Sequence, residues 1–347
     1  MRLVRLASLL LVAAAARASS VSDEITIAGT QSTPQNPRAG SVSNLLSASV
    51  DVGESWTVNA SAQVTVEAPT PAPAGAFPDR GGTVTDFSGG VDWDADDNWT
   101  FGITLDVSPE STIGSDARLR GQNPIDVLVQ STSSIASLET LAGYDTAGSS
   151  DLEWSFTAGV ALSRLETRQH ADATHEDGTS VSPAELRTRC TPVGSGCRAL
   201  LPAIDGLSGV LRYARVSAGA LATVRRDTDV GVSLDYYGYA DDPANVGLFT
   251  TATTGRFGTS APIAPLRYLV RPSLTHRFGA FSLKAWGQAG RYVSEAGQGT
   301  AALGAKAQYR FSRFFRMWIS ATGQRDEDPS GAISRTGILT LGAGYRF

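Results

Sequence analysis

Polar and apolar residues alternate one by one through most of this chain. In the run from Trp56 to Val66, every even-numbered position is apolar and every odd-numbered position is polar. A β-strand sends successive side chains to opposite faces, so such a run has one apolar face and one polar face. A helix would mix the two sets of side chains. The pattern therefore predicts β-strands.

The same alternation continues on both sides of short polar turns. The runs Phe87–Trp93 and Trp99–Val107 are separated by Asp94-Ala95-Asp96-Asp97-Asn98, and Asp and Asn favour tight turns. Comparable alternating runs lie at 152–162, 230–236, 301–311 and 339–347. The chain is therefore predicted to be a series of antiparallel hairpins.

Short and long connections alternate between the predicted strands. The short turns lie near 52–55, 94–98, 145–151, 225–229, 277–280 and 312–313. The long polar loops lie near 67–83, 108–134, 166–208, 240–263, 291–298 and 325–334, and the longest is that at about 166–208. Short periplasmic turns and long extracellular loops are typical of outer-membrane barrels.

The strand number follows from the direction of the last strand. That strand ends on the short-turn side, so the strand at 45–52 also runs toward the turns and needs a partner before it. The segment from Glu24 to Thr30 is the candidate. We expect an all-β fold, a closed antiparallel transmembrane barrel of about 14 strands. Twelve strands is the alternative, if one early hairpin lies outside the wall.

The strand lengths and the aromatic residues favour a membrane barrel over a soluble β protein. Most runs reach the 9–11 residues that a tilted strand needs to cross a bilayer. Aromatic rings favour the membrane–water interface, and here they lie on the apolar faces close to the short turns. These residues are Trp56, Trp93, Trp99, Trp154, Phe281, Phe311, Phe315, Tyr345 and Phe347.

The first residues have the features of an export signal. Arg2 and Arg5 precede the apolar stretch Leu6–Ala16, which is too short to span a bilayer, and Ala16-Arg17-Ala18 is a small-residue cleavage site. We expect residues 1–18 to be a signal peptide and residues 19–347 to form the barrel.

Charge and cysteine content narrow the functions further. Without Arg2, Arg5 and Arg17, 26 basic residues face 34 acidic ones, a formal charge of −8, which argues against a nucleic-acid partner. Cys190 and Cys197 close a small loop, and in an exported protein such a pair favours a disulfide over a metal site.

The C-terminal segment Leu339–Phe347 resembles the closing strand of Gram-negative outer-membrane β-barrel proteins. It ends in Phe347, and the alternate positions before it, including Tyr345, are apolar. The resemblance implies location in the outer-membrane lipid. It also implies that the barrel-assembly machinery reads Tyr345 and Phe347 as its signal.

The polar faces carry charge of opposite sign on different arcs of the predicted wall. The acidic set on the early strands is Asp86, Asp92, Asp106 and Glu153. The basic set on the late strands is Arg267, Arg271, Lys284, Lys306, Arg310 and Arg316. Such pore-lining charges would set ion selectivity. The alternative is that they pair and close the lumen as structural ion pairs.

Two functional classes remain. The first is a porin-like channel for passive diffusion of small hydrophilic solutes; the second is a structural or adhesive barrel with a closed lumen and functional extracellular loops. No catalytic motif is present, and no cofactor or metal is expected, since the loop residues His170, His175, Glu176 and Asp177 have no ligand spacing. Assembly of identical chains stays open.

Overall fold

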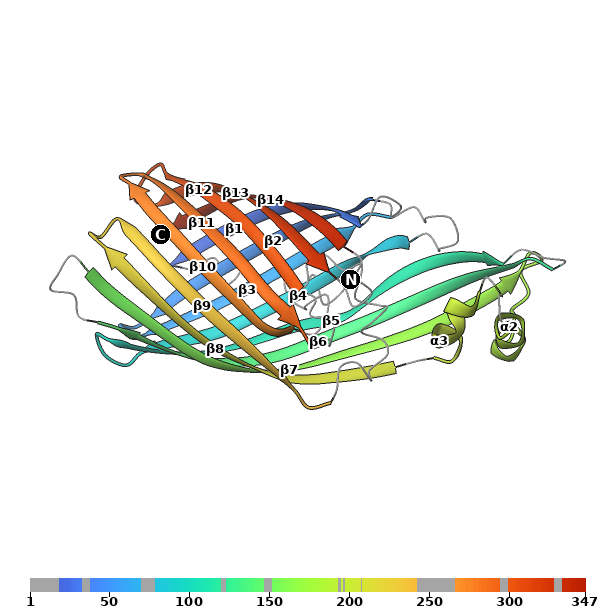
Figure 1. Ribbon diagram of the computed structural model, residues 1–347. Helices are drawn as coiled ribbons and strands as arrows, with labels where there is room; N and C mark the ends of the chain where they lie inside the picture. The colour runs from blue at the N-terminus through green and yellow to red at the C-terminus, as the bar shows by residue number, and fades with distance from the viewer. Residues whose placement is uncertain are drawn as a thin grey trace.

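The computed structural model describes residues 19–32, 38–69, 79–119, 123–146, 152–192, 195, 197–206, 208–241, 266–293, 299–327 and 333–347. In this part of the chain, 14 strands form a closed antiparallel barrel in which the first strand pairs with the last (Figure 1). The prediction of 14 strands is confirmed. The predicted signal peptide, 1–18, lies outside the described residues. No described helix is long and apolar enough to cross a membrane.

Each strand pairs with its neighbours in sequence. The strands are β1 (Ser20–Ser32), β2 (Arg38–Val52), β3 (Trp56–Glu67), β4 (Asp79–Asp94), β5 (Trp99–Leu119), β6 (Ile125–Asp145), β7 (Leu152–His175), β8 (Ser208–Val224), β9 (Thr228–Tyr239), β10 (Leu266–Phe278), β11 (Phe281–Tyr292), β12 (Gly299–Arg310), β13 (Phe315–Glu327) and β14 (Ile333–Arg346).

Pairing of β1 with β14 removes the free edges that an open sheet would have. The register runs from Ser20 opposite Arg346 to Ser32 opposite Ser334. The amide of Phe347 extends the ladder by donating to the carbonyl of Ser19 at 2.9 Å. Closure matters because the bilayer core offers no water to a backbone group that lacks a partner.

The outward faces form an apolar belt. On β7 the outward side chains from Leu152 to Leu162 are exposed and apolar, and the next outward positions are Arg164, Glu166 and Arg168. That change marks the extracellular edge of the belt. At the short-turn ends aromatic rings contact one another, as in Trp56 against Trp93 with centroids 5.9 Å apart. The belt matches the lipid-facing band of an outer-membrane barrel.

Three strands continue far beyond the belt, and this corrects two predicted loops. Residues 108–119, 125–134 and 166–175 are strand, because β5, β6 and β7 stay paired up to Leu119, Ile125 and His175. In Figure 1 these strands project well past the others. Above the membrane the outward face no longer needs apolar side chains. Their polar composition therefore resembled that of loops.

The described residues between β7 and β8 include a small helical cap on this extension. The cap contains α2 (Pro183–Cys190), η1 (Arg198–Leu200) and α3 (Leu201–Ile204). Ser182 begins α2 by accepting a hydrogen bond from the Glu185 amide at 3.2 Å. Leu186 packs into a buried apolar cluster with Ile125 and Val127. These two residues have the inward parity of β6, so the cap covers the lumen-side face of the extension.

The cap also covers the edge of β7. Pairing with β8 ends at Arg168, and seven more residues of β7 follow. The chain then turns back at Gly178, which has a left-handed φ of 82°. The His175 amide donates to the Thr179 carbonyl at 2.8 Å, and the Val181 amide donates to the Ala173 carbonyl at 2.9 Å. The returning segment thus replaces β8 as the partner of β7.

Cys190 and Cys197 form the predicted disulfide, and both cysteines are buried in the cap cluster. Replacing both with serine should loosen the cap and leave the barrel intact. The loop entropy of the eight residues from Cys190 to Cys197 corresponds to about 2.5 kcal/mol of local stability. Limited proteolysis within 176–206 should accelerate, while the heat-dependent gel mobility of the barrel should stay unchanged. A lower melting temperature of the whole barrel would contradict this prediction.

Candidate channel lumen

The strand register defines the lumen face, because it is opposite to the apolar belt. On the arc from β1 to β5 this face is mostly small and polar. A cavity of about 270 Å³ opens there between the strands. Its hydroxyl-bearing inward side chains are Ser20, Ser22, Ser47, Ser49, Ser61, Ser88 and Thr104. This arc offers hydrogen bonds and no large apolar surface.

The four predicted acidic residues have inward parity. Asp92 accepts a hydrogen bond from the side-chain amide of Asn59 at 2.6 Å, and Asp86 accepts one from the Ser108 hydroxyl. Asp106 lies on β5, next to the strand that carries Asp86, and Glu153 lies on β7 near the short turns. Within the described residues, no cationic side chain comes within 4 Å of any of the four.

Four of the predicted basic residues form a group that we call the basic ladder: Lys284, Lys306, Arg310 and Arg316. Lys284 is directly opposite Lys306 across β11 and β12, and Arg310 is opposite Arg316 across β12 and β13. Lys306 and Arg316 both lie over the ring of Trp318, at 4.5 and 5.6 Å from its centroid. No described carboxylate lies within 4 Å of the ladder.

The two remaining basic residues, Arg267 and Arg271, lie on β10. A register shift between Leu266 and Tyr268 places buried Leu266 opposite Tyr292, so strict alternation no longer assigns the exposed Arg267 to the lumen face. Arg271 does face inward, but it is paired with Asp235 at 2.7 Å. Alternation alone cannot reveal a bulge or a cross-strand ion pair.

Arg271 and Asp106 both line a second cavity of about 400 Å³, to which seven consecutive strands, β5 to β11, contribute. We call it the mouth cavity, because it lies at the extracellular edge of the belt. Its other polar residues were not predicted from the sequence. Arg215 and Glu139 form an ion pair at 2.5 Å, and Tyr213 faces Tyr237 with centroids 6.1 Å apart. Alternation within β6 and β8 could have indicated the inward parity of Glu139 and Arg215.

Two apolar clusters adjoin the mouth cavity. Leu165 and Leu211 pack with Tyr213 and Tyr239 on one side, and Leu266 and Leu269 pack with Tyr292 and Tyr237 on the other. The Tyr239 hydroxyl donates to the Leu266 carbonyl at 2.6 Å. The extracellular part of the lumen is therefore partly aromatic, whereas its β1–β5 arc is lined by hydroxyls.

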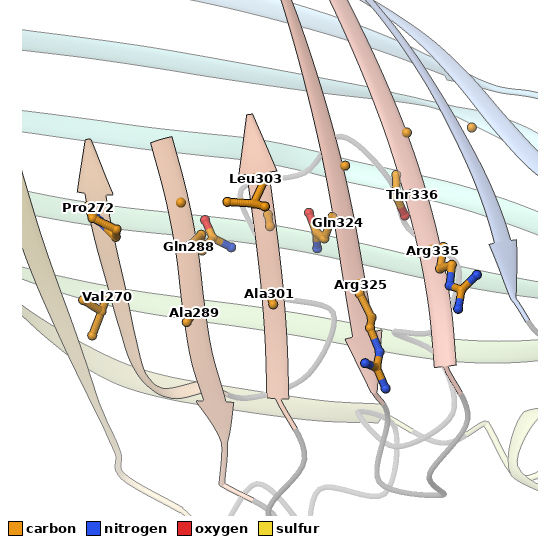
Figure 2. A pocket seen from close by; sticks show the side chains of 15 residues that line it. Val270, Pro272, Gln288, Ala289, Ala301, Leu303, Gln324, Arg325, Arg335 and Thr336 are labelled. Carbon is orange, nitrogen blue, oxygen red and sulfur yellow. The ribbon is translucent and has the colours of Figure 1, made fainter. Parts of the chain in front are cut away.

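A larger hollow of about 970 Å³ lies on the wall around β10–β14 and β1 (Figure 2). Most of its lining residues, including Pro272, Leu303 and Arg325, have outward parity. Leu303 is 74% exposed because directly paired glycines flank it at 287 and 323. This hollow therefore lies mainly on the lipid-facing surface of the barrel.

The histidines of the predicted loop 166–208 do not form a metal site with the described side chains around them. His170 contacts Asp172 at 3.0 Å, and His175 lies 3.5 Å from Glu185. The Thr179 hydroxyl and amide hold the pKa of Asp177 below its ordinary value. No described cluster of three His, Cys, Asp or Glu side chains could hold a metal ion.

Several solved structures share the fold of this chain at low sequence identity. The CymD monoaromatic hydrocarbon channel has a TM-score of 0.58 and 10% identity, covering 95% of this chain and 89% of that chain. A Pseudomonas aeruginosa FadL homologue has a TM-score of 0.55 and 11% identity, with 94% and 90% covered. The translocator domain of autotransporter NalP from Neisseria meningitidis has a TM-score of 0.51 and 8% identity, with 99% and 95% covered.

This chain is an outer-membrane β-barrel. No family model and no curated protein matches its sequence. At such low identities the structural likeness establishes the fold, and it agrees with the apolar belt and the short turns described above. What passes through the barrel has to be argued from its own lumen.

Proposed function

We propose that the barrel is a channel for passive diffusion of small hydrophilic solutes. The observation that carries this proposal is the basic ladder, four cationic side chains without a described carboxylate within 4 Å. Lys284, Arg310 and Arg316 are also exposed although they face inward. An unpaired charge is stable inside a barrel wall only when water solvates it.

A closed structural barrel would be expected to neutralise these charges. Neighbouring inward charges show that the fold can do so, since Arg277 pairs with Asp229 and Arg215 pairs with Glu139. The ladder instead places like charges directly opposite each other, which is unfavourable without solvent. Glu24 acts electrostatically on Lys306 from beyond 4 Å, and hydration of the lumen is the simplest way to stabilise the rest of the ladder.

The proposal differs from what the names of two similar structures describe. One is called a monoaromatic hydrocarbon channel, and another, from Ralstonia pickettii, a toluene transporter. The lumen of this chain has a serine-lined arc and unpaired charge, which favour water and polar solutes over a hydrocarbon. The mouth cavity adds tyrosine and leucine side chains, and its polar lining still includes the Glu139–Arg215 ion pair and Arg271, which is paired with Asp235.

Planar-bilayer recording of the refolded protein tests the proposal. We expect stepwise ion conductance in potassium chloride, because a hydrated lumen with fixed charge passes ions. A heat-denatured sample from the same preparation is the control. A correctly folded barrel that inserts but carries no current would overturn the channel and favour a surface barrel whose functional part is the cap.

A further inference from the structure

The mouth cavity differs from the basic ladder because its arginines are neutralised. Arg215 contacts Glu139 at 2.5 Å, and Arg271 contacts Asp235 at 2.7 Å. The side chain of Asp235 is only 4% exposed, whereas the other three remain 26–38% exposed. Three of the four charged groups can therefore still reach a solute in the cavity.

Paired charges favour some solutes over others. An ion bound to one partner would have to compete with the existing pair and would leave the other charge unpartnered, which is costly in a partly buried site. Yet a guanidinium has five N–H donors and a carboxylate has about four acceptor positions, so each pair keeps unused hydrogen-bonding capacity. A hydroxyl group of a solute can use both kinds of site, because it donates to the carboxylate and accepts from the guanidinium.

The remaining lining supplies flat apolar surface beside these polar groups. Tyr213 lies against Tyr237 at a 48° tilt, and Leu266 and Leu269 are buried next to them. Tyrosine combines a broad apolar face with a polar tip. A sugar ring has the matching chemistry, with C–H groups on one face and hydroxyls around its rim.

We propose that the mouth cavity is a binding site for an uncharged polyhydroxylated solute of the size of a mono- or disaccharide. Its volume of about 400 Å³ is within the range of roughly 300–1,000 Å³ that is usual for small-molecule sites. The proposal rests on the channel function and names its substrate class. Asp106 adds an acceptor that no described cation neutralises, so a small organic cation is the alternative to be tested.

The first experiment needs only the wild-type protein in planar bilayers. Glucose, maltose or choline chloride is added to the extracellular side, and polyethylene glycol of maltose-like mass controls for viscosity. We expect maltose to reduce the ion current in a saturable manner, well beyond the polyethylene glycol effect. Conductance without sugar block would overturn the binding site and leave the channel intact. Saturable block by choline alone would overturn the uncharged solute.

The second experiment uses matched variants. Replacing Glu139 and Arg215 together with glutamine removes the pair without leaving a bare charge, and we expect the half-blocking maltose concentration to rise at least about tenfold. Tyr237→Phe keeps the ring and removes only the hydroxyl, so a smaller increase is expected. Arg187→Gln, in the cap and outside the mouth cavity, should change nothing. Equal block in all variants would overturn the site.

A third measurement separates the two proposals. Isothermal calorimetry of maltose with the folded barrel in detergent does not depend on conductance. Saturable heat that disappears in the Glu139/Arg215 double variant would support the site even if no current were seen. Absence of binding heat in a barrel that conducts would overturn the site alone.

Discussion

Deletion of Phe347 should block assembly of the barrel in the outer membrane and leave export across the inner membrane intact. The Phe347 amide closes the ladder onto Ser19, and its ring, 66% exposed to lipid, stacks edge-on against Tyr345 at 4.9 Å. The resemblance to closing strands implies that the assembly machinery reads this residue. We expect at least about a tenfold loss of heat-modifiable barrel in outer-membrane fractions, with unfolded chain degraded in the periplasm.

The matched control for this deletion is Phe311→Ser, compared with Phe347→Ser. Phe311 is 59% exposed at the short-turn end of the barrel and also stacks on a tyrosine, Tyr309, at 4.7 Å. The Phe311→Ser variant therefore loses a similar lipid contact and keeps the C-terminal residue unchanged. Equal defects in the two serine variants would show that loss of an interfacial aromatic is responsible, and that Phe347 has no special role in assembly.

Neutralising the basic ladder should make the channel more selective for cations. In water, one unit charge at 4 Å changes the energy of a passing ion by about 1 kcal/mol, which is about fivefold in local concentration. Replacing Lys284, Lys306, Arg310 and Arg316 together with glutamine should therefore shift the reversal potential in a salt gradient toward cations. Replacing Asp86, Asp92 and Asp106 with asparagine should shift it toward anions.

Salt and position provide the controls for these shifts. At 1 M salt the screening length falls to about 3 Å, so both shifts should shrink. Arg187→Gln removes a positive charge from the cap, where Arg187 pairs with Asp205 at 2.8 Å, and should leave selectivity unchanged. If neither lumen set alters the reversal potential of a conducting barrel, the fixed charges do not control ion passage.

The inward or outward side of most residues was predictable from the sequence, because side chains alternate strictly along a strand. Lys284 and Asp106 lie on the expected face for this reason. The alternation fails where a bulge intervenes, as at Arg267. It also says nothing about which strand supplies a partner, so the pairing of Arg215 with Glu139, 76 residues away, could not be foreseen.

The loop predictions at 108–134 and 166–208 were wrong in part for a related reason. A strand inside the membrane is recognised by its apolar outward face, and β5–β7 lose that face above the belt while keeping their backbone pairing. Ile125 and Val127 remain buried there only because the cap covers them. A contact with a later segment of the chain thus preserves a strand that local composition assigns to a loop.

The turn-back of the chain at Gly178 has a consequence for cells crowded with copies of this barrel. A sheet that rises above the membrane with a bare edge can recruit a strand from any neighbouring molecule and begin to aggregate. Here the segment Thr179–Val181 already occupies the edge of β7 next to Ala173 and His175. That end of the β7 edge is therefore closed to a strand from an adjacent barrel.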